Sequence, residues 1–177
     1  MAPGIDDTAS YLMPGSGDTW AQAVAAAGGR GTQRLRSAGP VNPPDWVAES
    51  LDTPPAKSVI ARRRTMYLND RPVELTDSYY PLAVAADTAL ERPGRIPGGA
   101  ITLLAELGYT AHHADEAVDL DARPTADEAT LLSIARDAHV VRIRRVVRTA
   151  AGAPFEAMEI VMIPAGRVLH HRALVET

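Results

Sequence analysis

Three consecutive arginines, Arg62, Arg63 and Arg64, are the residues best suited to binding chemistry in this chain. They lie in a run of period two, which predicts a β-strand with residues 62 and 64 on one face and residue 63 on the other. Two guanidinium groups on one face repel each other unless a negative charge lies between them, and Glu74 on the next predicted strand could supply it. The pair is either a bidentate clamp for a carboxylate or phosphate, or a solvated strand face with cross-strand ion pairs.

A second arginine cluster alternates with valine and isoleucine and comprises Arg142, Arg144, Arg145 and Arg148. Arg145 shares its predicted face with apolar residues, and a buried guanidinium needs a carboxylate partner. The candidate partners are Glu116, Glu156 and Glu159. We predict a structural ion pair between Arg145 and Glu116.

Other chemistries find no support in the residues. The chain has no cysteine, which excludes disulfides, thiolate metal sites and cysteine nucleophiles. The histidine pairs at 112–113 and 170–171 are adjacent and would face opposite sides of a strand, and no metal-ligand spacing or G-x-S-x-G motif occurs. We therefore predict no metal, no cofactor and no catalytic residue.

Composition is that of one globular domain. The chain has 177 residues, 46% of them apolar, and 18 basic against 22 acidic side chains give a net charge of −4. This charge and the 5% aromatic content argue against nucleic acid as a direct partner. No membrane-length apolar run or signal layout occurs, so we expect a cytoplasmic protein without membrane association.

Two predicted β-hairpins would position the arginines. Residues 59–68 and 72–80 are joined by Asn69-Asp70, and residues 139–149 and 154–163 surround a turn at Gly152. Further strands are predicted at 31–37, 109–120 and, as an edge strand, 168–174. Helices are predicted at 20–27, 45–51, 82–90 and 98–107, and Thr125 and Glu128 form a capping box before another. Residues 1–17 read as a flexible arm and 18–177 as one α+β domain whose antiparallel sheet is covered on one face by helices.

A series of short motifs in a fixed order is more specific than any one of them. The series begins with Val59-x-x-Arg62-x-Arg64, Arg71-Pro72-Val73-Glu74 and Ser78-Tyr79-Tyr80-Pro81. It continues with Gly98-Gly99-Ala100-Ile101-Thr102, Leu107-Gly108-Tyr109, an acidic position at Glu116 and Ala122-Arg123-Pro124-Thr125. It ends with Val140-Val141-x-Ile143-x-Arg145 and Gly152-x-Pro154-Phe155-Glu156. From about residue 18 to 174, the chain resembles the UTRA domain, the effector-binding domain of GntR-type transcription regulators of the HutC-like branch.

This resemblance implies a chorismate-lyase-like fold, a small-molecule effector and a homodimer. By matching position, the implied ligand-binding residues are Arg62, Arg64, Glu74, Ser78, Tyr80, Thr102, Thr19 and Trp20, with Glu156 or Glu159. Asp18 departs from members that bind sugar phosphates, because a carboxylate beside the helix start would repel a phosphate. We therefore expect another ligand, with a carboxylate or polar heteroatom at the arginines.

No winged-helix pattern precedes Trp20, so DNA would be reached only through a domain absent from this sequence. The chain is either an excised domain or a natural stand-alone protein. The leading hypothesis is a sensor whose ligand controls the arrangement of two subunits. The alternatives are an enzyme of the same fold acting on a carboxylate-bearing metabolite, with Glu74 or Glu156 as acid or base, and a stand-alone partner of full-length regulators.

Overall fold

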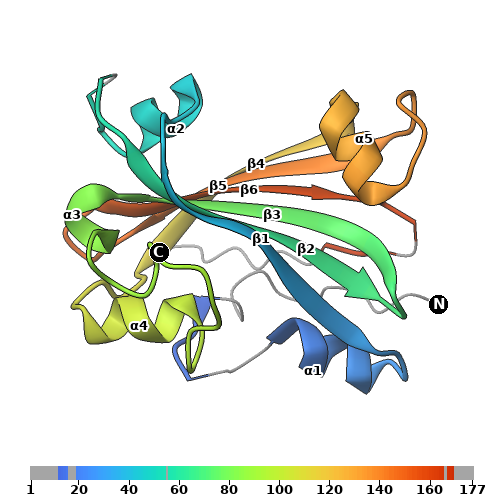
Figure 1. Ribbon diagram of the computed structural model, residues 1–177, viewed down its shortest axis with the longest axis horizontal. Coiled ribbons are helices and arrows are strands. Elements are labelled where there is room, and N and C mark those ends of the chain that lie inside the picture. The colour runs from blue at the N-terminus through green and yellow to red at the C-terminus, as the bar shows by residue number, and fades with distance from the viewer. Residues whose placement is uncertain (1–11, 16–18, 55, 166, 170–177) are drawn as a thin grey trace, which may run out of the picture.

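A six-stranded antiparallel sheet organises the molecule (Figure 1). The computed structural model describes residues 12–15, 19–54, 56–165 and 167–169. The strand order is β1-β2-β3-β6-β5-β4, and every neighbouring pair is antiparallel. The strands are β1 (Gly31–Val41), β2 (Val59–Leu68), β3 (Arg71–Pro81), β4 (His113–Ala122), β5 (Val140–Arg148) and β6 (Pro154–Met162).

Both predicted hairpins are present, and their turns have the expected backbone. Asn69 and Asp70 connect β2 to β3 with φ values of 48° and 66°, the left-handed pair that a two-residue hairpin turn requires. Gly152, with φ of 81°, lies between β5 and β6. The antiparallel α+β fold predicted from the sequence is confirmed.

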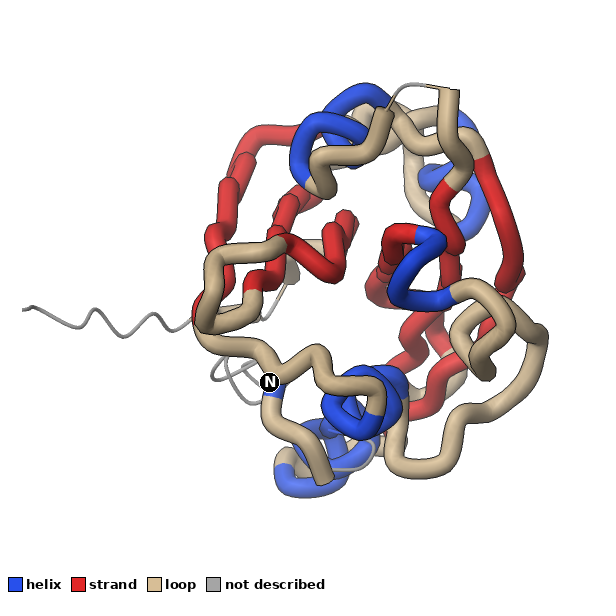
Figure 2. Tube along the Cα trace, turned by 90° about the vertical axis from the view of Figure 1, so that its left-hand side faces the viewer, coloured by secondary structure: helices blue, strands red, loops and turns tan. Residues whose placement is uncertain are grey.

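Helices lie on both faces of the sheet, so the expectation of a single covered face was wrong. The helices are α1 (Thr19–Ala26), α2 (Asp45–Ser50), α3 (Leu82–Ala85), α4 (Ala100–Glu106) and α5 (Ala126–Leu132). Figures 1 and 2 show α1 and α4 on one side of the strands, with α2 and α5 on the other. The central strands are buried from both sides as a result. Val47 of α2 and Leu51, which follows that helix, cluster with Tyr79, whereas Leu104 of α4 joins the cluster that holds Tyr80.

The capping box predicted before α5 is confirmed. The Thr125 hydroxyl accepts from the Glu128 backbone N–H at 3.3 Å, and the Glu128 carboxylate accepts from the Thr125 N–H at 2.8 Å. The same carboxylate pairs with Arg142 of β5. One local sequence signal therefore both starts the helix and attaches it to the sheet.

Other elements differ in length from their predictions. β1 runs to Val41 rather than to residue 37, with a register shift between Leu35 and Ser37, and β4 begins at His113 rather than at residue 109. The helix predicted at 82–90 stops at Ala85, because Ala86 is extended and Asp87 takes a φ of 62°. Most of the predicted arm and the end of the predicted strand 168–174 lie outside the described residues.

Arg62 explains how the loop after α3 is held. Its side chain is buried, with 6% of its surface exposed, and the guanidinium donates to four backbone carbonyls. The acceptors are the oxygens of Ala89 (3.1 Å), Leu90 (3.0 Å), Arg92 (2.8 Å) and Gly94 (2.8 Å). Burial lowers the pKa of this guanidinium, yet the carbonyl dipoles satisfy its N–H groups without any carboxylate. Arg62 thus fixes the loop that leads into α4.

Replacing Arg62 tests this structural role. Arg62→Leu leaves four carbonyls without their charged donor, so we expect the free energy of unfolding to fall by about 3 kcal/mol or more in urea denaturation. The matched control is Arg64→Leu on the same strand face, which removes only one long hydrogen bond of 3.4 Å to Gln33. Equal and small losses in the two variants would contradict the role given to Arg62.

Candidate functional site

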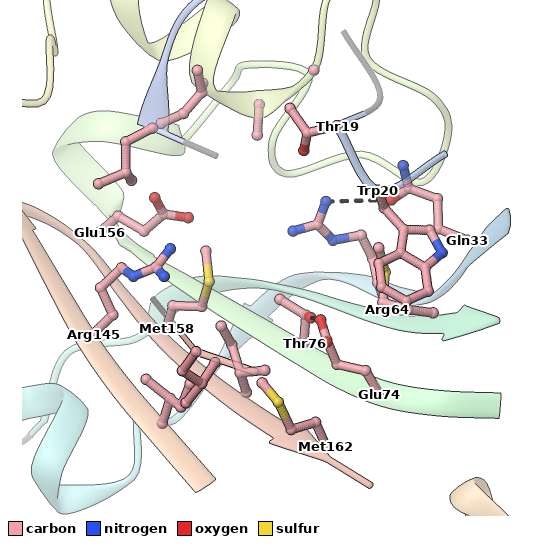
Figure 3. A pocket seen from close by; sticks show the side chains of 18 of the residues that line it. Thr19, Trp20, Gln33, Arg64, Glu74, Thr76, Arg145, Glu156, Met158 and Met162 are labelled. Carbon is pink, nitrogen blue, oxygen red and sulfur yellow. Dashed lines mark hydrogen bonds between the residues drawn. The ribbon is translucent and has the colours of Figure 1, made fainter. Parts of the chain in front are cut away.

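A cavity of about 140 Å³ lies between the sheet and the helices α1 and α4 (Figure 3). The pairing register determines which side chains reach it. Arg64 lies opposite Thr76, which lies opposite Ile160, and Ile160 lies opposite Ile143. Because side chains alternate along each strand, these residues of four neighbouring strands share one face.

Most of the cavity wall is apolar. Its floor comes from the sheet and consists of Met66, Ile143, Met158, Ile160 and Met162. Its other apolar residues are Leu12, Trp20, Ala100, Ile101 and Leu169, so segments near both ends of the chain contribute. The sequence analysis did not identify the three methionines, although Met66 lies two residues after Arg64, and Met158 and Met162 lie two and six residues after Glu156, which places them on the same strand faces.

Arg64 projects into the cavity (Figure 3). Nη1 makes a long 3.4 Å hydrogen bond to the Gln33 side chain, and the buried Nε atom has no hydrogen-bond partner. Within the described part of the chain, no carboxylate forms an ion pair with Arg64. A guanidinium in this state can offer two parallel N–H donors to an anion.

Glu156 lies across the cavity from Arg64 (Figure 3). It is buried, and one carboxyl oxygen accepts from the Tyr80 hydroxyl at 2.8 Å. Burial raises the pKa of the Glu156 carboxyl, and the Tyr80 hydrogen bond and the nearby Arg64 charge lower it without cancelling the rise. Burial, followed by the adjacent Glu156, likewise raises the pKa of Tyr80. Glu156 therefore holds a proton more readily than an exposed glutamate.

Arg145 is the second cavity guanidinium, and its charge is matched. Its Nε atom lies 2.5 Å from a Glu116 carboxylate oxygen, with the Arg145 side chain 2% exposed. The pair joins β5 to β4, and it is the pairing we expected from the sequence. Arg145 still borders the cavity beside Glu156 (Figure 3).

Glu74 also borders the cavity, but both of its carboxylate oxygens are engaged. One accepts from the Thr76 hydroxyl at 3.1 Å, and the other pairs with Arg167 at 2.9 Å. The Arg167 guanidinium lies 5.0 Å from the centre of the Trp20 ring. The sequence analysis missed Arg167, because it stands in no predicted element and reaches Glu74 across 93 residues of sequence.

The remaining sequence-predicted residues are divided by the fold. Thr19 and Trp20 line the cavity at the start of α1, whereas Ser78 and Tyr80 are buried without lining it. Thr102 uses its hydroxyl within the chain, donating to Gly98 at 2.7 Å and accepting from Gly15 at 3.0 Å.

Glu159 is separated from this site by the sheet itself. It lies on the opposite face, where it pairs with Arg142 at 3.1 Å and with Arg144 at 3.0 Å. Asp18, on which the argument against a phosphosugar rested, lies outside the described residues.

A wider groove of about 760 Å³ adjoins the cavity. Arg62 and Arg95 line it, and Gln33, Arg64 and residues 98–100 border both spaces. Arg64 therefore stands where the cavity meets the groove. In the described residues no three acidic or histidine side chains gather as a metal site would need, and no helix there is long and apolar enough to cross a membrane.

Comparison with known proteins agrees with this architecture. The UTRA domain family model matches residues 26–164. An uncharacterized HTH-type transcriptional regulator of Streptomyces coelicolor, SCO4628, is 33% identical over 114 residues, which cover 62% of this chain and 42% of that protein. The chain thus spans less than half of the curated relative that it matches.

Solved structures share the fold at low sequence identity. A crystal structure assigned to the GntR family of transcriptional regulators matches with a TM-score of 0.81 and 21% identity, covering 99% of this chain and 71% of the other. The effector domain of PhnF from Mycobacterium smegmatis matches with a TM-score of 0.70 and 15% identity, over 89% of this chain and 95% of that one. Since the family model covers most of the sequence and the architecture agrees, the chain belongs to the UTRA domain family.

Proposed function

We propose that this chain is the effector-binding module of a GntR-type transcription regulator of the HutC-like branch, and that its effector is a small anionic molecule held at Arg64. The observation that carries the proposal is a half-buried guanidinium that forms no ion pair with any described residue and is directed into a largely apolar cavity. The buried Nε atom of Arg64 has no hydrogen-bond partner, so an incoming anion meets a charged donor that is still available. Membership of the UTRA family and the relative named as an HTH-type regulator support the same reading.

Arg64 and Glu156 have complementary roles in this proposal. Arg64 binds the anionic group of the effector, whereas Glu156 stands on the far side of the cavity beside Arg145. Burial raises the pKa of Glu156 and so favours its neutral form, which repels an anion in the same cavity less than the ionised form does. Three further residues act from outside the cavity. Tyr80 holds Glu156 through its hydrogen bond, and Arg62 fixes the loop before α4. Ser78 is buried in the sheet.

The effector is expected to act by changing which arrangement of the module is populated. It would contact the sheet, α1 and α4 together, and it favours the arrangement in which these elements close on it. In a homodimeric regulator this closure alters how two modules, and the winged-helix domains joined to them, are oriented. DNA is then contacted by those domains rather than by this one.

The first test is whether Arg64 retains a natural ligand. Purified protein is incubated with a metabolite extract, desalted and measured by native mass spectrometry. We expect a bound mass on the wild type and none on Arg64→Leu, with little difference in melting temperature between them. Arg63→Leu, on the opposite face and paired with Asp77 at 3.1 Å, is the matched control and should keep the bound mass. Equal retention by all three proteins would contradict the proposal, and a ligand converted during incubation would indicate an enzyme.

The second test is whether Glu156 is neutral in the folded protein. A raised carboxyl pKa contributes stability that is fully present below the pKa of the unfolded chain and is lost as pH rises through the folded value. We therefore expect wild type to lose stability relative to Glu156→Gln as pH rises from acidic to neutral, by about 1.4 kcal/mol for each unit of the pKa rise. Urea denaturation of both proteins across this pH range measures the difference. A difference that does not change with pH would show that Glu156 is ionised like a surface glutamate.

A further inference from the structure

We propose that the effector is a monocarboxylate built on a single apolar ring, with the ring on the methionine floor of the cavity and the carboxylate at Arg64. This inference rests on the proposed function and specifies the chemical class of its ligand. Four features of the cavity carry it: volume, lining, the engagement of its polar groups, and the position of its free charge.

The volume of the cavity suits one ring. At about 140 Å³ it is close to the volume of about 150 Å³ at which an apolar protein cavity binds benzene. A fused-ring body or a long acyl chain needs more enclosed space than this. The adjoining groove can take a polar substituent, but it is open to solvent and lined partly by Arg62 and Arg95.

The lining favours a flat apolar body. Met66, Met158 and Met162 place three thioethers beside Ile143 and Ile160 on the floor of the cavity. Methionine is flexible and polarisable, and its sulfur makes favourable contacts with aromatic rings. Trp20 adds an aromatic edge near the start of α1.

The polar groups of the cavity are poorly placed to receive a sugar. Both Glu74 oxygens are engaged, by Thr76 and by Arg167, and the Thr76 hydroxyl is used in the first of these bonds. Arg145 directs its Nε to Glu116. A polyol would have to share these engaged groups, which makes them weaker partners for its hydroxyls than free ones.

The free charge defines the acidic end of the ligand. Arg64 stands at the mouth of the cavity, so a carboxylate bound to it leaves the ring directed inward, toward Met158. Glu156 lies on the far side of the cavity, beside Arg145 (Figure 3). One carboxylate therefore balances Arg64, whereas a phosphate dianion would bring a second negative charge that Arg64 alone does not balance.

Methyl NMR of the full chain tests this class directly. The methionine methyl groups are labelled with carbon-13, and benzoate, phenylacetate, acetate and glucose 6-phosphate are titrated separately. We expect benzoate or phenylacetate to shift the signals of Met66, Met158 and Met162 saturably, through the ring current of the bound aromatic group. Acetate, which lacks the ring, and glucose 6-phosphate should leave them unmoved. The three signals are assigned by single Met→Leu substitutions.

Variants locate the two ends of the ligand. Arg64→Leu should weaken binding of the ring acid about tenfold or more, because the carboxylate loses a charged bidentate partner. Ala100→Leu should block the ring by filling the cavity from α4, whereas Ala105→Leu on the same helix, outside the lining, should bind as wild type does. Undiminished affinity in Arg64→Leu would overturn the position of the carboxylate. Undiminished affinity in Ala100→Leu would overturn the position of the ring.

The other results separate this inference from the function on which it rests. Shifts caused by glucose 6-phosphate but not by the ring acids would overturn the ring-acid class and leave the effector-binding function standing. No shift with any of the four probes would also overturn the ring-acid class. In that case retention of an extract ligand by wild type, and its loss in Arg64→Leu, still decides the proposed function independently.

Discussion

The register of the central strands is the constraint on which the site depends. Side chains alternate along a strand, so a slip of one residue between β2 and β3 would move Arg64 and Met66 to the α2 side of the sheet. In their place Arg63 and Thr65 would face the cavity. The turn at Asn69-Asp70 and the burial of both sheet faces fix this register from two directions. Strand pairing therefore determines which side chains line the cavity, and so determines its chemistry.

Given that register, the protein has to place several guanidinium groups near one interior face, and it neutralises them in different ways. Arg62 is surrounded by backbone carbonyls, Arg145 is paired with Glu116 and Arg167 is paired with Glu74. Arg64 has no comparable partner among the described residues. Arg62, Arg145 and Arg167 show that a structural arginine in this protein is held by backbone carbonyl or carboxylate acceptors, and Arg64 differs from all three. A fourth arginine that forms no ion pair with a described residue, at the edge of a cavity, suits the anion site that we propose.

What the sequence predicted correctly depends on local chemistry. The hairpin turn at Asn69-Asp70 and the capping box of Thr125 and Glu128 need only neighbouring residues, and both are present. The alternation along β2 and β5 also identified which arginines share a face. The parts that failed depend on distant segments: α3 is cut short where the Arg62-bound loop begins, and helices cover the second face of the sheet. The distinct roles of Arg62 and Arg64, and the Arg167–Glu74 pair, likewise come from tertiary contacts that no periodicity encodes.

The cavity is lined by two kinds of structure, and the difference between them determines which part can move when a ligand binds. The floor is a continuous sheet in which each strand is hydrogen-bonded to its neighbours, so the floor deforms little. The roof is assembled from separate pieces: Leu12, the start of α1, the first turn of α4 and Leu169. Their hydrogen bonds and ion pairs among the described residues include Gly15 to Thr102, Trp20 to Tyr67 and, next to Leu169, Arg167 to Glu74. In the function that we propose, a ligand that contacts floor and roof together adds its binding energy to the contacts between them and so favours closure of the roof.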